Sequence, residues 1–125
     1  MQLPRRLLWI DGSGGAIAGI LMLLLLGWLT KWYALPRDLV LLIGCTNLAY
    51  GTYSLSLARR SQRPKALIHL LIVANLVWGA LCLRWAVLHF ETASFWGLAH
   101  LIGEGLYVGG LGCLEWRWRE QLLTA

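Results

Sequence analysis

The chain has 125 residues, of which 58% are hydrophobic and 14% are charged, and its formal net charge is +5. A soluble domain carries about 25% charged residues, so the composition excludes an ordinary soluble domain and predicts a membrane protein. The basic residues stand in short clusters between apolar runs, which indicates membrane topology rather than a nucleic-acid surface, and no nucleic-acid partner is predicted.

Four apolar segments are long enough to cross a bilayer as helices, since a transmembrane helix needs roughly 20 mainly apolar residues. They cover approximately residues 7–30, 39–57, 66–83 and 95–114. Short connections favour antiparallel packing of consecutive helices. The sequence therefore predicts one domain over residues 1–125, an all-α membrane protein with a four-helix up-down transmembrane bundle.

The first segment contains an acidic residue near one edge, Asp11, followed by several glycines. Asp11 can cap the start of the helix by accepting hydrogen bonds from free backbone N–H groups. Alternatively, it pairs with His69, which lies at a similar depth near the start of the third segment. Gly15 and Gly19 form a GxxxG motif, which allows two helix backbones to approach closely.

A short loop rich in aromatic residues, 31–38, follows the first segment and is typical of a membrane interface. The second segment carries Asn47 near its middle, with Tyr50 on the same helical face. A polar loop then leads into the third segment, where Asn75 lies near the middle. Trp78, close to Asn75, is either a stacking wall for a ligand or filler of the core.

The fourth segment carries a stripe of polar residues at helical spacing that runs from His100 to Glu115. His100 and Glu104 are i,i+4 neighbours, close enough to interact. Tyr107 follows on the same stripe, at the predicted depth of Tyr50 on the second segment. The two tyrosines either line a pocket or simply pack.

Three glycines lie on a neighbouring face of the fourth segment, about 100° around the helix from the polar stripe. These are Gly105, Gly109 and Gly112. Such a face packs against another helix of the same chain or against a second chain. Besides the lipid bilayer, the predicted partners are therefore further copies of the same chain, in a homo-oligomer, or the other subunits of a larger membrane complex.

Polar side chains are costly in hydrocarbon, so those inside the segments are the main functional clue. From a rise of about 1.5 Å per residue, Asn47, Asn75 and Glu104 are predicted to meet at a similar depth. Amide groups can hydrogen-bond either protonation form of a carboxyl group. Together with His100, Glu104 is a candidate site for a proton or a small ligand.

Three functions are compatible with this pattern. The first is a small membrane protein that binds or transports a proton or a small ligand at this polar site. The second is a non-catalytic accessory or structural subunit whose polar residues only join helices. The third and weakest is a lipid-modifying membrane enzyme with Glu104 and His100 as acid and base, so enzymatic activity is not the favoured interpretation.

No metal or cofactor site is predicted. The cysteines, Cys45, Cys82 and Cys113, lack the spacing of a metal site or a redox pair, and they read as small buried hydrophobic residues. Haem needs two axial ligands at matching depth, whereas His69 and His100 are predicted at different depths.

Counting Lys and Arg between the four segments predicts the orientation. Three cations fall on one side: Lys31, Arg37 and Arg84. Eight fall on the other: Arg5, Arg6, Arg59, Arg60, Arg63, Lys65, Arg117 and Arg119. The imbalance predicts a multi-pass protein with both termini cytoplasmic, in the inner membrane if the cell is bacterial.

Overall fold

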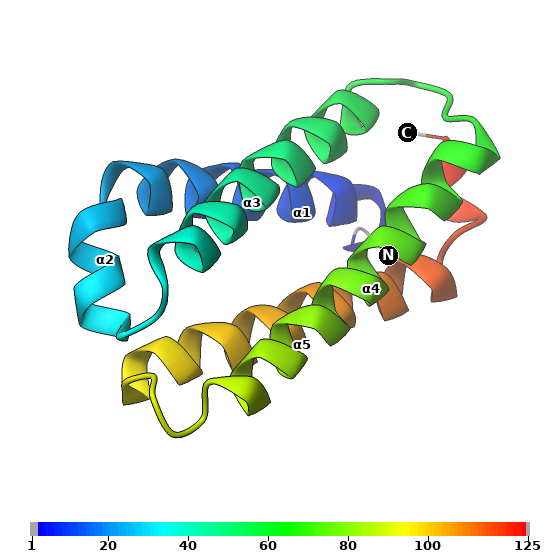
Figure 1. The fold of residues 1–125 in the computed structure, drawn as a ribbon. Helices are drawn as coiled ribbons and strands as arrows, with labels where there is room; N and C mark the ends of the chain where they lie inside the picture. The colour runs from blue at the N-terminus through cyan, green and yellow to red at the C-terminus, as the bar shows by residue number, and fades with distance from the viewer. Residues whose placement is uncertain (1–2, 125) are drawn as a thin grey trace.

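The computed structural model of the chain describes residues 3–124, and side chains from Arg6 onward. The ends of the predicted 1–125 domain and the side chain of Arg5 lie outside these limits. Five α-helices and a short 3-10 turn form in the order α1 (Leu3–Leu24), α2 (Leu26–Tyr33), α3 (Arg37–Ala58), α4 (Lys65–Leu88), α5 (Phe95–Arg117) and η1 (Gln121–Leu123) (Figure 1).

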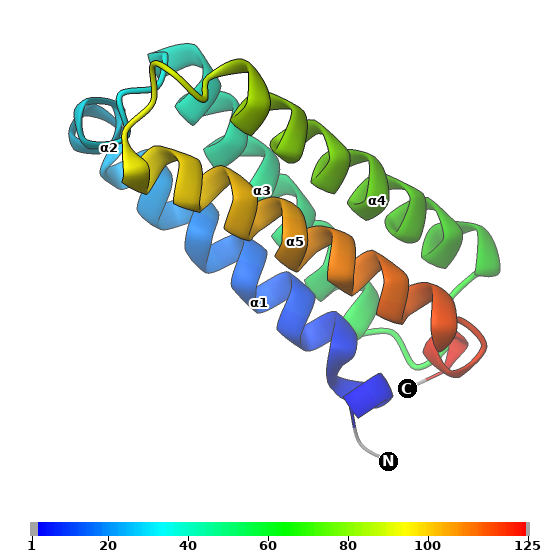
Figure 2. The ribbon, with the colours of Figure 1, turned by 90° about the horizontal axis from the view of Figure 1, so that it is seen from below.

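The all-α prediction is confirmed over the described residues, which contain no strand beyond one isolated bridge between Gln62 and Thr124. Four helices, α1, α3, α4 and α5, are long and apolar enough to cross a membrane. The start of α1 and the end of α5 lie at the same end of the bundle (Figure 2).

The long helices form two antiparallel pairs. α1 packs along α3, and α4 packs along α5 (Figure 1, Figure 2). The expectation that all consecutive helices are close neighbours is wrong for α3 and α4, which diverge along most of their length (Figure 1). α1 and α5 contact each other instead and bring the two pairs together.

Glycines allow the close approach within each pair. A Cβ atom on Gly19 of α1 would lie 2.5 Å from the backbone nitrogen of Leu48 on α3, and one on Gly15 would lie 2.9 Å from the carbonyl oxygen of Asn47. On the other pair, a Cβ on Gly79 of α4 would lie 2.9 Å from the carbonyl oxygen of Gly105. Both pairs therefore pack backbone against backbone, as small residues permit in membrane helices.

The remaining predicted glycines take different positions in the second pair. Gly112 faces Leu76 and Asn75 of α4, whereas Gly109 contributes its backbone, which lies beneath Gly79. The glycine motifs thus serve contacts within the chain.

The predicted first segment, 7–30, is too long by one helical turn or more. The helix ends at Leu24, and the chain continues after Leu25 as the separate helix α2, which turns away from the axis of α1 (Figure 1). A single helix over residues 3–33 would measure about 46 Å, well beyond a hydrocarbon core of about 30 Å. The bend buries Leu29 in the core and points Tyr33 back toward α5.

The third and fourth segments, by contrast, end later than predicted. α4 continues to Leu88 rather than residue 83, because Arg84 lies exposed on its surface while Ala86 remains buried. α5 continues to Arg117 rather than residue 114, which places Glu115 inside the helix.

The C-terminal tail folds back through Arg63, which is only 6% exposed. Its guanidinium group donates hydrogen bonds to the carbonyl oxygens of Leu57 and Ala58 at the end of α3, and to those of Leu122 and Thr124 beside η1. Arg63 thus satisfies carbonyl groups that a helix end leaves free. Burial lowers the pKa of Arg63.

Candidate functional site

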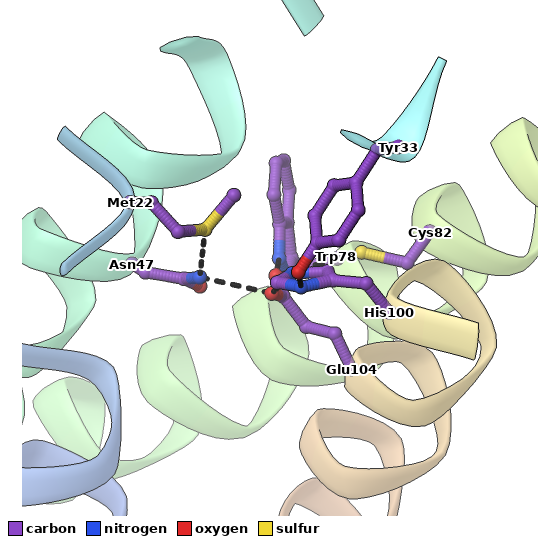
Figure 3. A network of polar contacts seen from close by, with 7 residues as sticks. All are labelled: Met22, Tyr33, Asn47, Trp78, Cys82, His100 and Glu104. Carbon is purple, nitrogen blue, oxygen red and sulfur yellow. Dashed lines mark hydrogen bonds and ion pairs between the residues drawn. The ribbon is translucent and has the colours of Figure 1, made fainter. Parts of the chain in front are cut away.

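Glu104 of α5 is the centre of a buried network of polar side chains (Figure 3). Its Oε1 atom accepts from Asn47 Nδ2 of α3 at 2.9 Å and lies 2.9 Å from His100 Nε2, one turn earlier on α5. Its Oε2 atom accepts from Trp78 Nε1 of α4 at 2.7 Å and from the thiol of Cys82 at 3.7 Å. The carboxyl group, 9% exposed, thus joins three helices.

His100 extends the network toward α2. Its Nδ1 atom lies 2.9 Å from the hydroxyl oxygen of Tyr33 (Figure 3). Burial, and then the charge of Glu104, raise the pKa of Tyr33, so the phenol keeps its proton and can donate it to Nδ1. In that arrangement the Nε2–H group of His100 donates to Glu104, and the imidazole is oriented from both sides.

The sequence did not point to three members of this network. The sequence predicts Tyr33 to be an aromatic residue of the membrane interface, and it contacts His100 only because the chain bends at Leu25. Cys82 is fully buried as predicted for a small hydrophobe, yet its thiol faces Glu104. The same prediction is wrong for Cys45 and Cys113, which are exposed on the outer faces of their helices. Met22 of α1 accepts a weak contact of 3.7 Å from Asn47. Sequence gives no signal for such contacts, because they depend on how each helix is rotated.

Asn75 does not join Glu104. Its Nδ2 atom instead donates to Asp11 Oδ2 of α1 at 3.0 Å and to Glu115 Oε1 of α5 at 2.7 Å. Asn75 precedes Trp78 by three residues, about 4.5 Å along α4, and this offset places it with the second set of acids. We call Asp11, Asn75 and Glu115 the second polar cluster.

Both predictions for Asp11, a helix cap and a contact with His69, are wrong. The residue lies well inside α1, which begins at Leu3, so it does not cap that helix. It bonds to Asn75 rather than to His69. The Nε2 atom of His69 is buried without a hydrogen-bond partner among the described residues, and its ring lies beside Trp116 at 6.1 Å between centroids.

A cavity of about 60 Å³ separates the two groups of polar side chains. A water occupies roughly 30 Å³ in the liquid, so the cavity has room for about two waters. It is lined by Asp11, Gly14, Gly15, Ala18, Asn47, Tyr50, Asn75, Trp78, Glu104, Tyr107 and Val108. The lining contains two acids, two amides and two tyrosines, and no basic residue.

The predicted site residues therefore divide by position. Asn47 and Trp78 both donate to Glu104 at one wall of the cavity, and Asp11 and Asn75 lie at another. Tyr50 and Tyr107 line it, which leaves His100 behind Glu104 and His69 apart from it. Residues 6–124 contain no group of three His, Cys, Asp or Glu side chains that could hold a metal ion.

The chain matches no family model, no curated protein and no solved structure.

Proposed function

We propose that this chain is a membrane protein that binds a proton at the Glu104–His100 pair and passes it across the bilayer. The observation that carries the proposal is the cavity, whose lining includes Asp11 and Glu104 but no basic side chain. An acidic, water-sized space inside hydrocarbon favours a proton or another small cation. Drug-sized ligands need about 300–1,000 Å³, so they are too large for it.

The contacts of Glu104 suit reversible proton binding. His100 Nε2 and Glu104 Oε1 lie 2.9 Å apart, within the range of a proton transfer through a hydrogen bond. Asn47 can serve either protonation form, because its amide group both donates and accepts. Tyr33 supplies a further hydroxyl on the opposite side of the imidazole.

The orientation proposed with this function places both termini in the cytoplasm. It rests on the eight cations against three between the apolar segments. Tyr33 and His100 then lie toward the outer side, and Glu115 lies toward the cytoplasmic side.

Proton flux into liposomes tests the proposal. Purified protein is reconstituted with a trapped pH-sensitive dye, and a potassium gradient with valinomycin sets a negative inside potential. Wild type and Glu104→Gln are compared with Glu91→Gln, whose side chain is exposed in the loop before α5. We expect flux above that of protein-free liposomes for wild type and Glu91→Gln, and loss of that excess in Glu104→Gln. Equal proton flux through wild type, Glu91→Gln and Glu104→Gln would refute the proposal.

A structural role is the second candidate, and one observation favours it. Asn47 and Asp11 belong to the α1–α3 pair, whereas Glu104, Asn75 and Glu115 belong to the α4–α5 pair. Both polar groups thus hold the two pairs together, as interhelical hydrogen bonds do in membranes. This role predicts no flux in wild type and a lower thermal midpoint for Glu104→Gln, since a charged hydrogen bond contributes about 1.5–3 kcal/mol.

A further inference from the structure

The second polar cluster contains two carboxyl groups with too few donors for both to be ionised. Asn75 Nδ2 is the single side-chain donor recorded for them among the described residues, at 3.0 Å from Asp11 and 2.7 Å from Glu115. Glu115 is completely buried, and its Oε2 atom has no partner. Glu104, by contrast, accepts from the N–H groups of Asn47 and Trp78 and also lies 2.9 Å from His100 Nε2.

No Lys, Arg or His side chain among residues 6–124 forms an ion pair with either carboxyl group. The ionisable side chains that face the pair are Tyr50 of α3 and Tyr107 of α5, both neutral hydroxyls. α4 contributes the amide of Asn75, and η1 contributes the apolar Leu122 to the core nearby. Two carboxylates close together at low dielectric repel each other strongly, so a pair of this kind retains one proton between them.

The two carboxyl groups lie near each other, because both are within hydrogen-bond distance of the same Asn75 Nδ2 atom, at 3.0 Å and 2.7 Å. A proton on one of them would supply the missing donor and would give the free oxygen of Glu115 a partner. The unpartnered oxygen of Glu115 and the amide group shared by both acids are therefore both explained by one proton bound between the two carboxyl groups.

We propose that Asp11 and Glu115 share a single proton and form a second proton-binding site, which water in the cavity links to Glu104. The link to transport rests on the proposed function, whereas the shared proton does not. Asp11 and Glu104 both line the cavity, so water there can bridge them.

The proposed route crosses most of the hydrocarbon core. His100 and Glu115 are fifteen residues apart on α5, which corresponds to about 22 Å along the helix. The bilayer core measures about 30 Å. Tyr33 extends the route at one end, and Glu115 lies within the last turn of α5 at the other.

Infrared spectroscopy of the full chain in lipid tests the shared proton, because a protonated buried carboxyl group has a distinct C=O band. Glu104→Gln is the background, so that the site of the band is unambiguous. We expect one such band near neutral pH, its loss in Glu104→Gln/Glu115→Gln, and a titration midpoint lower by about one pH unit or more when Asp11→Asn removes the repelling charge. Absence of the band, or a band indifferent to both substitutions, would overturn the proposal.

Isotope labelling keeps the test independent of how the variants fold. The protein keeps Asp11 and Glu115 and is labelled with ¹³C in the side-chain carboxyl group of either all glutamates or all aspartates. The label shifts the band if the proton resides on that residue type. A band that moves with neither label contradicts the pair.

Proton flux through Glu115→Gln separates this proposal from the proposed function. If wild type conducts and Glu104→Gln does not, normal flux in Glu115→Gln would refute the route while the function stands. If wild type does not conduct, the function fails, and the infrared band alone decides whether Asp11 and Glu115 hold a proton.

Discussion

At the scale of single residues, the site depends on hydrogen bonds that orient one imidazole and one carboxyl group. Tyr33, His100 and Glu104 form a chain of contacts of 2.9 Å each. None of the three side chains is fully exposed, so each contact takes place at reduced dielectric, where it is stronger than in water.

Tyr33 makes the site sensitive to alkali. Its pKa is raised in the fold above the ordinary value of 10.0, so the folded state disfavours the phenolate. The stability contributed by Tyr33 is therefore complete below pH 10 and is lost as the pH rises through the higher folded pKa. We expect Tyr33→Phe to lose less stability than wild type between pH 9 and about pH 11. Thermal midpoints across this range measure the difference, and parallel curves would contradict the assignment.

Sequence reasoning located part of the site and misplaced the rest. The contact of His100 with Glu104 follows from helical spacing alone, which is a local property. The contact of Asn47 with Glu104 follows from counting depth along two helices. Depth counting also predicts that Asn75 meets Glu104, but it cannot fix the rotation and offset of a helix, and Asn75 bonds to Asp11 and Glu115 instead. The sequence does not predict the position of Tyr33, because that position depends on the bend at Leu25.

At the scale of elements, each helix pair depends on glycine contacts that leave no room for a side chain. A Cβ on Gly19 would lie 2.5 Å from a backbone nitrogen and 2.8 Å from the carbonyl oxygen of Gly44. Backbone atoms cannot move aside as a flexible side chain can, so α1 would have to separate from α3.

Gly19→Ala is therefore expected to destabilise the protein by about 1–3 kcal/mol, the usual cost of overpacking. The matched control is Gly103→Ala on α5, where an added Cβ meets nothing within 4 Å. That substitution is expected to be neutral or to stabilise by up to about 1 kcal/mol, because alanine favours the helix. Thermal unfolding in detergent compares the two, and equal midpoints would contradict the packing described for α1 and α3.

Arg63 links the end of α3 to η1 and is a further test at this scale. Lysine keeps the charge but cannot reproduce four hydrogen bonds from a planar fork. We expect Arg63→Lys to cost about 2–4 kcal/mol, with Arg60→Lys, an exposed neighbour, as the control. Unfolding midpoints measure the loss of stability, and the rate of proteolysis measures the exposure of the C-terminal tail. An unchanged rate of proteolysis of the tail would count against the role of Arg63.

At the scale of the whole molecule, composition and segment length predicted the helical class and the number of long helices. They did not predict that the two pairs would be α1–α3 and α4–α5, or that α3 and α4 would diverge. That arrangement depends on glycines whose partners lie on another helix, which a single sequence cannot identify.

The proposed orientation can be tested with single cysteines. After Cys45, Cys82 and Cys113 are replaced by alanine, Gln62→Cys and Glu91→Cys place one thiol in each of two exposed loops, which the proposed orientation puts on opposite sides of the membrane. In sealed vesicles with the cytoplasmic face inward, we expect a membrane-impermeant maleimide to label position 91 and to spare position 62. The opposite result would reverse the orientation, and labelling at both positions in intact vesicles would exclude four crossings.

Glu104 connects the two helix pairs and is the residue that we propose binds the proton. The most direct measurement records, on the same preparation, the initial rate of proton entry under an inward potential and the thermal midpoint of Glu104→Gln beside wild type. We expect the variant to remain folded while its proton entry falls to the leak of empty liposomes. A folded variant that conducts protons as fast as wild type would contradict a proton site at Glu104.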